Sequence, residues 1–244
     1  MDQTIFVTNR STQVSDSDVQ KMTAACAKQI KLHVAPAHNT KPVPVVYLDR
    51  DAQPPSKQAR IITVQDTLDD PDALGYHTQD GSEHIWGVVG TKAAMSQGAL
   101  ALTEDYSISS ILSHEVAELF IDPFCGGWFD SGEGFLVAYE VGDPVQSDYY
   151  LIDKVAVSNF VTAAWFNPMA ATSDSFDHMG HLHAPFSMSK GGYWVQLAEG
   201  KATQKFGEDM PEWLIKAKRS ANSRTQRIGR SQPSVSSTNT EESK

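Results

Sequence analysis

One short segment places four ionisable side chains where they could act together. Residues 113–123 read SHEVAELFIDP and contain His114, Glu115, Glu118 and Asp122. On an α-helix, with about 100° between successive residues, all four fall within roughly one quadrant. Most other positions of the segment are Val, Ala, Leu, Phe or Ile. This pattern predicts a buried helix with one polar edge.

The carboxylates on that edge need a counter-charge. Buried carboxylates that repel one another are costly unless a cation or bound protons neutralise them. The chain itself offers few cations nearby, because Lys92 and Lys154 are the only basic residues between Arg60 and Lys190. A bound metal ion is therefore the favoured explanation. The alternative is that the carboxylates bind no metal and share protons.

The spacing His-Glu-x-x-Glu resembles the HExxH motif of the zincin metallopeptidases, with Glu in place of the second His. This resemblance implies that His114 and Glu118 are metal ligands and that Glu115 is the general base acting on water. The string HEVAELFIDP is also similar to uncharacterised zincin-like proteins of bacteria and tailed phages.

The gluzincin branch of that family implies the rest of the site. Its third ligand is a Glu about twenty residues downstream on a second helix, and Glu140 lies 22 residues after Glu118. Asp143 would then orient the ligand histidine from behind. Asp122, two turns after His114, is a rival third ligand or a second carboxylate behind the site.

The glutamate at position 118 bears on the choice of metal. One histidine with two carboxylates is a harder and more anionic ligand set than the usual histidine-rich zinc site. Zinc is the expected ion, and Mn²⁺, Fe²⁺ or Ca²⁺ are alternatives.

Two other groups of residues are weaker candidates. His178, preceded by Asp177, could stabilise an oxyanion as a downstream histidine does in some zincins. Together with His181 and His183 it could instead belong to a solvated polar loop. Tyr76 and His77 could stabilise an oxyanion too, although an aromatic residue in a strand more often serves only packing.

Hydrophobic patterning predicts the elements that must position these residues. Strands are expected at 4–8, 43–49, 59–65, 75–77, 84–90 and 192–197, and an early helix at 16–34. The segment 135–142 is either a short buried helix or a strand. The motif helix should end at Asp122, because Pro123 disfavours helical geometry there. The expected fold is α+β and zincin-like: a mixed sheet with an early helix, a buried metal-site helix, a second helix and a polar tail. The strand at 75–77 is expected at the sheet edge, where zincins hold substrate by backbone pairing.

Charge divides the chain into two parts. The 244 residues carry 20 Lys+Arg and 30 Asp+Glu, a net charge of −10. Residues 216–244 are near +5 and leave the preceding part near −15. We expect one domain over 1–215, followed by a basic Ser/Thr-rich tail over 216–244 that is disordered unless a protein partner holds it.

The same composition bears on partners and location. An acidic body repels the phosphates of nucleic acid, so we do not expect a nucleic-acid partner. No run approaches the roughly 18 apolar residues of a membrane span, and the start of the chain has no signal-peptide pattern, so we expect cytoplasmic synthesis. The expected function is metal-dependent hydrolysis of peptide bonds in a peptide or protein substrate. The alternative is a non-catalytic assembly protein, such as a phage virion component, that retains the fold and a structural metal.

Overall fold

The first half of the chain supplies a mixed five-stranded β-sheet. The computed structural model describes residues 3–218 except 57, 70–72, 80–83 and 105. The strand order is β2-β1-β3-β5-β4, and β4 at the edge runs antiparallel to β5 while the other pairs are parallel. The bounds are β1 Ile5–Asn9, β2 Val45–Leu48, β3 Arg60–Gln65, β4 Gly75–Gln79 and β5 Ile85–Gly90. The predicted strands and the predicted edge position of 75–77 are confirmed.

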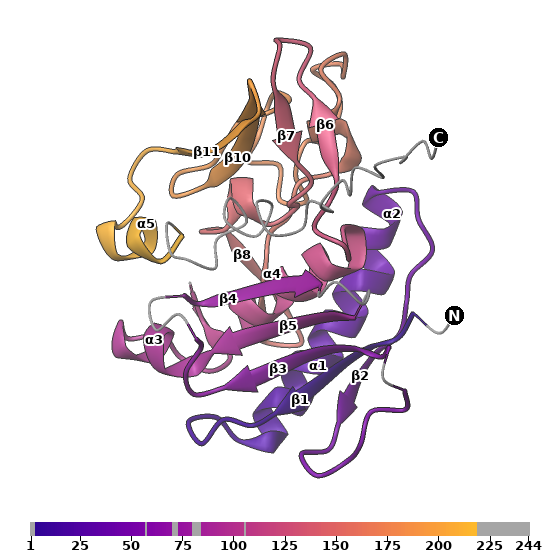
Figure 1. The fold of residues 1–244 in the computed structure, drawn as a ribbon, viewed down its shortest axis with the longest axis vertical. Helices are drawn as coiled ribbons and strands as arrows, with labels where there is room; N and C mark the ends of the chain where they lie inside the picture. Colours follow the sequence, from indigo (N-terminus) through magenta and orange to yellow (C-terminus); the bar gives the residue numbers. More distant parts are fainter. Residues whose placement is uncertain (1–2, 57, 70–72, 80–83, 105, 219–244) are drawn as a thin grey trace, which may run out of the picture.

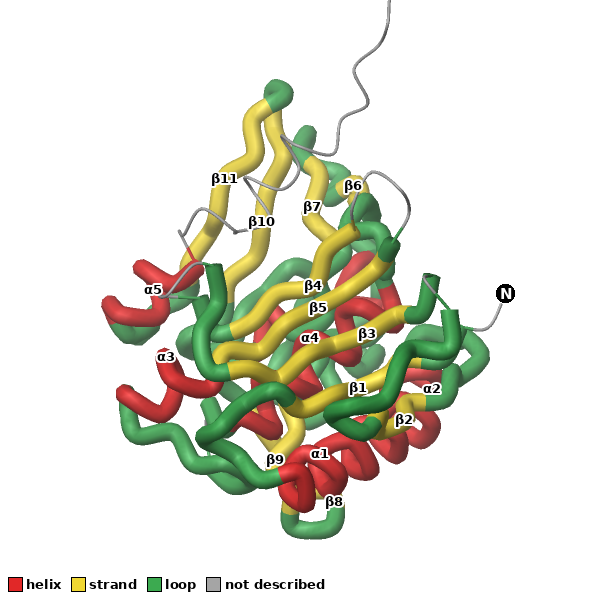
Figure 2. The backbone as a smooth tube through the Cα atoms, turned by 60° about the horizontal axis from the view of Figure 1, so that its bottom comes forward, coloured by secondary structure: helices red, strands yellow, loops and turns green. Residues whose placement is uncertain are grey.

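Two long helices lie against the same face of this sheet (Figure 2). The first, α1 (Asp16–Gln29), starts at Ser15, whose side chain accepts a hydrogen bond from the Asp18 N–H at 3.1 Å. Its buried face follows helical spacing through Val19, Met22 and Cys26. It continues as the π-helical turn η1 (Ile30–Val34) and the short helix α2 (Ala35–Ala37). The predicted early helix is therefore present.

The second long helix, α4 (Ile108–Ile121), carries the motif. The Ser107 side chain caps it by accepting a hydrogen bond from the Ser110 N–H at 3.2 Å. Every residue from Ile108 to Phe120 is buried. The helix ends before Asp122, which has φ −126° and ψ 69°, because Pro123 disfavours helical geometry at that residue. Both the burial and the end of this helix are as predicted.

The second half of the chain combines six short strands with long connecting loops (Figure 1). A four-stranded antiparallel sheet has the order β11-β10-β7-β6, and β8 pairs separately with β9. The strands of this four-stranded sheet are β6 Trp128–Asp130, β7 Leu136–Ala138, β10 Tyr193–Ala198 and β11 Lys201–Phe206. The separate pair consists of β8 Tyr149–Ile152 and β9 Val155–Ser158. The remaining elements are α3 Thr91–Ser96, α5 Glu212–Lys218 and the 3₁₀ turns η2 Asp143–Val145 and η3 Ala163–Phe166.

The predicted second helix after the motif is wrong. The segment before Glu140 forms the β6–β7 hairpin, and Glu140 lies two residues beyond the end of β7. Short runs of aromatic and β-branched residues favour strands, and the connection between them includes Gly132 and Gly134 at φ +75° and +88°, which suits a tight turn rather than a helix. Residues 219–244 of the expected tail lie outside the described residues. Helix α5 (Glu212–Lys218) crosses the domain boundary expected after residue 215.

Strand register decides which residues of β4 face the helices. In the β4–β5 pair, Gly75 lies opposite Val89 and His77 lies opposite Gly87. Residues directly opposite each other share a face of the sheet, and Val89 is buried in the main core with Val116 and Leu112 of α4. Gly75 and His77 therefore point toward α4.

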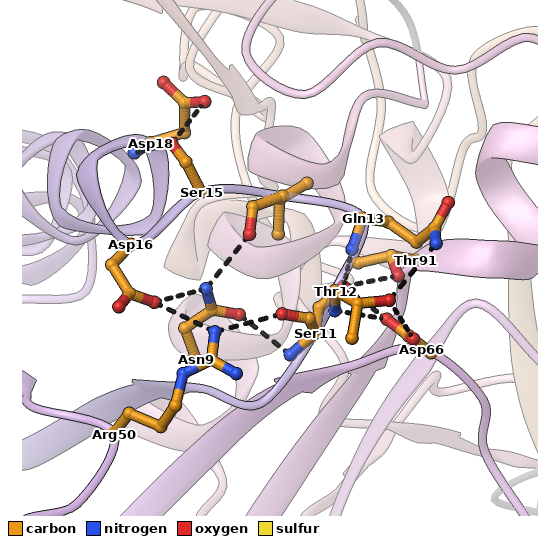
Figure 3. A network of polar contacts seen from close by, with 11 residues as sticks. Asn9, Ser11, Thr12, Gln13, Ser15, Asp16, Asp18, Arg50, Asp66 and Thr91 are labelled. Carbon is orange, nitrogen blue, oxygen red and sulfur yellow. Dashed lines mark hydrogen bonds and ion pairs between the residues drawn. The ribbon is translucent and has the colours of Figure 1, made fainter.

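A polar network ties the ends of β1 and β3 to the start of α3 (Figure 3). Asp66, just after β3, accepts hydrogen bonds from the Ser11 hydroxyl at 2.6 Å and the Thr12 N–H at 2.7 Å. The Ser11 hydroxyl also lies 3.0 Å from the Thr91 hydroxyl. The hydrogen bonds from Ser11 and Thr12 lower the pKa of Asp66 to about 2.

Replacing Asp66 by Asn should make the free energy of unfolding less dependent on pH in the acidic range. Because the pKa of Asp66 in the folded protein lies below its ordinary value of 3.8, the stabilisation is complete above about pH 5 and is lost as the pH falls through about 2. We expect D66N to lower the free energy of unfolding by about 1–2 kcal/mol at pH 7, a value already reduced for solvent screening. Urea denaturation at pH 7 and pH 2 measures this, with D69N as the exposed control. A D66N deficit that persists unchanged at pH 2 would contradict the assignment.

Candidate metal centre

Helix α4 presents His114, Glu115 and Glu118 on the side that faces β4 and the loop after β7. The relative exposures are 7% for His114, 3% for Glu115 and 4% for Glu118. Helical spacing brings His114 and Glu118 side by side one turn apart. The three residues fall into two groups of metal-ligating side chains, which share Glu118.

The first group consists of His114, Glu118 and Asp143. His114 Nε2 lies 3.2 Å from Glu118 Oε1 and 3.3 Å from Asp143 Oδ1. One ring nitrogen can donate only one hydrogen bond, and charge-assisted bonds are usually about 2.7–2.9 Å long. Ligand atoms about 2.0–2.1 Å from one tetrahedral ion lie about 3.3–3.4 Å apart. Both distances from His114 Nε2 fit that spacing, and the ligand atoms of all three residues lie within 4.8 Å of one another.

The second group consists of His77, Glu115 and Glu118. His77 Nδ1 lies 3.6 Å from Glu115 Oε2 and 3.7 Å from Glu118 Oε2. The other ring nitrogen, Nε2, lies 3.1 Å from the backbone oxygen of Asp122. A carbonyl oxygen can only accept, so Nε2 carries the proton and Nδ1 faces the two carboxylates. Metal-binding histidines are oriented by backbone carbonyls in this way.

The site concentrates negative charge. Glu115, Glu118, Glu140 and Asp143 are all buried, and the described residues include no buried lysine or arginine. Burial raises the pKa of Tyr193 well above its usual value, and Asp143, Glu118 and Glu140 raise it further. The Tyr193 hydroxyl thus stays protonated and hydrogen-bonds to Asp143.

The charge also acts on His77. Burial by itself lowers the pKa of His77, but Cys125 and the carboxylates of Glu115 and Glu140 outweigh it and raise the pKa well above the usual value. In the metal-free protein the raised pKa favours a proton on His77, and a metal ion that binds the ring would have to displace that proton.

The structure brings most of the predicted residues together, with three differences. Asp143, expected behind the ligand histidine, lies on the same Nε2 atom as Glu118. Glu140, expected as the third ligand, is buried and its charge acts on His77 and Tyr193, yet it belongs to neither group. The loop after β7, rather than a helix, carries both residues, and this shifts the closest carboxylate to Asp143.

Asp122 and His178, both predicted to belong to the site, lie outside the two ligand groups. The Asp122 carboxylate accepts hydrogen bonds from the N–H groups of Gly126 and Gly127 at 3.2 and 2.9 Å, so it organises the turn after α4. His178 is exposed, and its ring stacks on His33 and Phe160 at centroid distances of 4.5 and 5.1 Å. Neither group of ligands includes either residue.

Sequence reasoning named His77 only as a possible oxyanion-stabilising residue and not as a ligand, and it missed Tyr193. The signal for His77 is its place in β4, where alternation puts Gly75 and His77 on one face. A sequence does not reveal which face the motif helix covers. Tyr193 lies more than fifty residues after the motif, so only the tertiary structure brings it to Asp143.

A glycine lets the chain pass close to His114. A Cβ atom at Gly142 would lie 2.4 Å from His114 Nδ1, a distance that the ring and backbone cannot both tolerate. The Gly142 N–H also donates to Glu118 Oε1 at 3.2 Å. This residue therefore holds two members of the first group in place.

Replacing Gly142 by Ala should displace the His114 ring and weaken metal binding by about 10–100-fold, as changes behind a metal ligand do. Isothermal titration with Zn²⁺ or Mn²⁺ measures this affinity. Gly126→Ala is the matched control, because the nearest atom to its added Cβ is the Phe124 oxygen at 3.8 Å. Unchanged affinity in G142A would show that His114 does not bind the ion.

A small pocket opens beside the cluster. Its volume is about 30 Å³, and its lining includes Gly75, His114, Glu115 and Tyr106. A water molecule needs about 10–15 Å³ of such space, so the pocket has room for water next to Glu115.

Comparisons with known proteins give no family for the chain. Within its described part, no helix is both long and apolar enough to cross a bilayer. No family model, curated protein or solved structure matches the chain significantly.

Proposed function

We propose that this protein is a metal-dependent hydrolase of peptide bonds, with the metal held by His114, Glu118 and Asp143. The observation that carries the proposal is the position of Glu115. It lies between the ligand residues of α4 and the edge strand β4, and its Oε1 is 3.0 Å from the place where a Cβ of Gly75 would be. A base, a ligand set and the edge strand of the sheet thus meet at one point.

The residues suit a divalent ion. One imidazole nitrogen and two carboxylate oxygens, already at co-ligand spacing, form a donor set that binds Zn²⁺ and also suits Mn²⁺ or Fe²⁺. A bound ion would acidify a water molecule and polarise the scissile carbonyl group. Tyr193, through its hydrogen bond, holds the Asp143 carboxylate in orientation.

Glu115 is the candidate general base. Its side chain is buried beside the water-sized pocket that Gly75 and His114 also line. A buried carboxylate next to a metal site can take a proton from water and deliver it to the leaving amine. Only Glu115 among the four carboxylates lines this pocket.

The edge strand supports a peptide substrate. The Gly90 N–H donates to the Leu74 oxygen at 2.8 Å, so Leu74 and, by alternation, Tyr76 pair with β5. The backbone groups of Gly75 then point away from β5, next to Glu115. An extended peptide can add to such an edge by backbone hydrogen bonds, which would bring its carbonyl group to the base.

This arrangement supports a zincin-like fold, in which a mixed sheet with an antiparallel edge strand precedes the motif helix. Two features depart from the gluzincin pattern: the closest third carboxylate is Asp143, and it lies in the 3₁₀ turn η2 rather than on an α-helix. We therefore extend the resemblance to the sheet, the motif helix and the base, and not to the third ligand.

A second candidate function is a structural metal site in an assembly protein, such as a virion component. The pocket of about 30 Å³ favours it, because that volume holds water but no substrate side chain without movement of the surrounding chain.

Cleavage of a diverse peptide library, followed by mass spectrometry, distinguishes the hydrolase from the structural metal site. The protein is stripped with chelator and reloaded separately with Zn²⁺, Mn²⁺, Fe²⁺ or Ca²⁺. We expect cleavage with at least one ion and none after chelation. Absence of cleavage with every ion, in protein shown to contain metal, would contradict the hydrolase and leave the structural role.

A further inference from the structure

We propose that the cluster binds two divalent ions, with Glu118 as a bridging ligand between them. The first ion takes His114, Glu118 and Asp143, and the second takes His77, Glu115 and Glu118. This inference rests on the metal binding in the proposed function and not on hydrolysis.

The orientation of Glu118 provides the first argument. Its Oε1 lies 3.2 Å from His114 Nε2, whereas its Oε2 lies 3.7 Å from His77 Nδ1. Each oxygen therefore serves a different histidine. A carboxylate that gives one oxygen to each ion suits two-metal sites, in which the ions are about 3.5–4 Å apart.

The orientation of His77, the histidine of the second group, provides the second argument. Its Nε2–H donates to the Asp122 backbone oxygen at 3.1 Å, and its Nδ1 points into the space between Glu115 and Glu118. Nδ1 contacts both carboxylates at ion-pair distances, which are longer than the about 2.7–2.9 Å of a charge-assisted hydrogen bond. The observed 3.6 and 3.7 Å leave room for an ion between the three groups.

Charge provides the third argument. Glu115, Glu118, Glu140 and Asp143 bring four formal negative charges into a buried site. One divalent ion together with a proton on His77 would leave one of them uncompensated, which is costly in a medium of low dielectric constant. Two divalent ions balance all four, with both histidines neutral as ligands.

The second ion leaves Glu115 able to act as a base. Its Oε2 faces His77 and would bind the ion, while its Oε1 faces Gly75 at the edge strand. The two oxygens therefore have separate roles, and the second ion would fix the carboxylate in the position that a base needs.

Metal stoichiometry tests the inference. Full-length protein is stripped with chelator, reloaded with Mn²⁺, freed of excess ion and measured by inductively coupled plasma mass spectrometry. We expect two ions per chain in the wild type, one in His77→Gln and two in His183→Gln, an exposed histidine that serves as the matched control. Electron paramagnetic resonance of the wild type should show the signal of an exchange-coupled Mn²⁺ pair, a readout that does not depend on any variant folding.

The other outcomes are equally informative. One ion in both wild type and H77Q, with an isolated Mn²⁺ signal, overturns the second site and leaves the proposed function intact. One ion in the wild type and none in H77Q also overturns it, because the single ion then lies at His77. No ion in the wild type overturns this inference together with the metal site on which the proposed function depends.

Discussion

Replacing Glu118 by Gln is expected to abolish metal binding and to reverse the order of stability of the two proteins. Because its oxygens face both His114 and His77, the change removes a ligand from both groups at similar volume. An ion present at about 1000 times its Kd stabilises the wild type by about 4 kcal/mol, or about 8–16 °C in Tm for a chain of this size. Metal should leave the Tm of E118Q unchanged.

Without metal, E118Q should be more stable than the wild type, because it removes one of four buried negative charges that repel one another. Differential scanning calorimetry with and without metal measures both effects. Glu133→Gln, in an exposed loop, is the matched control and should behave as the wild type. An equal metal-induced rise in Tm for E118Q and the wild type would show that Glu118 is not a ligand.

Replacing Glu115 by Gln should lower kcat/KM for peptide cleavage by about 10²–10⁴-fold, the usual contribution of a general base. Gln has the size of Glu but cannot accept a proton from water. Glu115 does not belong to the group of His114, Glu118 and Asp143, so E115Q should still contain the ion at that group. Cleavage kinetics and metal content, measured on the same preparation, separate loss of the base from loss of metal.

His178→Ala is the control for that experiment. Its ring is exposed and stacks on His33, so we expect unchanged kcat/KM. Cleavage by E115Q at the wild-type rate would exclude Glu115 as the base. A large loss in H178A would instead support the sequence-based expectation that this histidine stabilises the oxyanion.

The local parts of the site could be predicted from the sequence because helical geometry determines them. The spacing of His114 and Glu118 places both on one helix face, and the apolar residues around them predict burial. Asp122-Pro123 defines the helix end. Runs of β-branched residues likewise predict most strands of the first sheet, and the turn residues at 79–82 predict the one that carries Gly75.

The long-range parts could not be predicted in the same way. His77 joins the cluster because β4 is the antiparallel neighbour of β5 and the register turns it toward α4. Asp143 replaces Glu140 in the first group because the chain after α4 forms a hairpin and a 3₁₀ turn instead of a helix. Periodicity is too weak in such short segments to distinguish these alternatives.

Anomalous diffraction from crystals of metal-loaded protein tests the central claim most directly. Data collected above the absorption edge of the loaded ion should give a peak within about 2.5 Å of His114 Nε2 and of carboxylate oxygens of Glu118 and Asp143. Absence of any anomalous peak among these side chains, in protein whose metal content has been confirmed, would contradict the account.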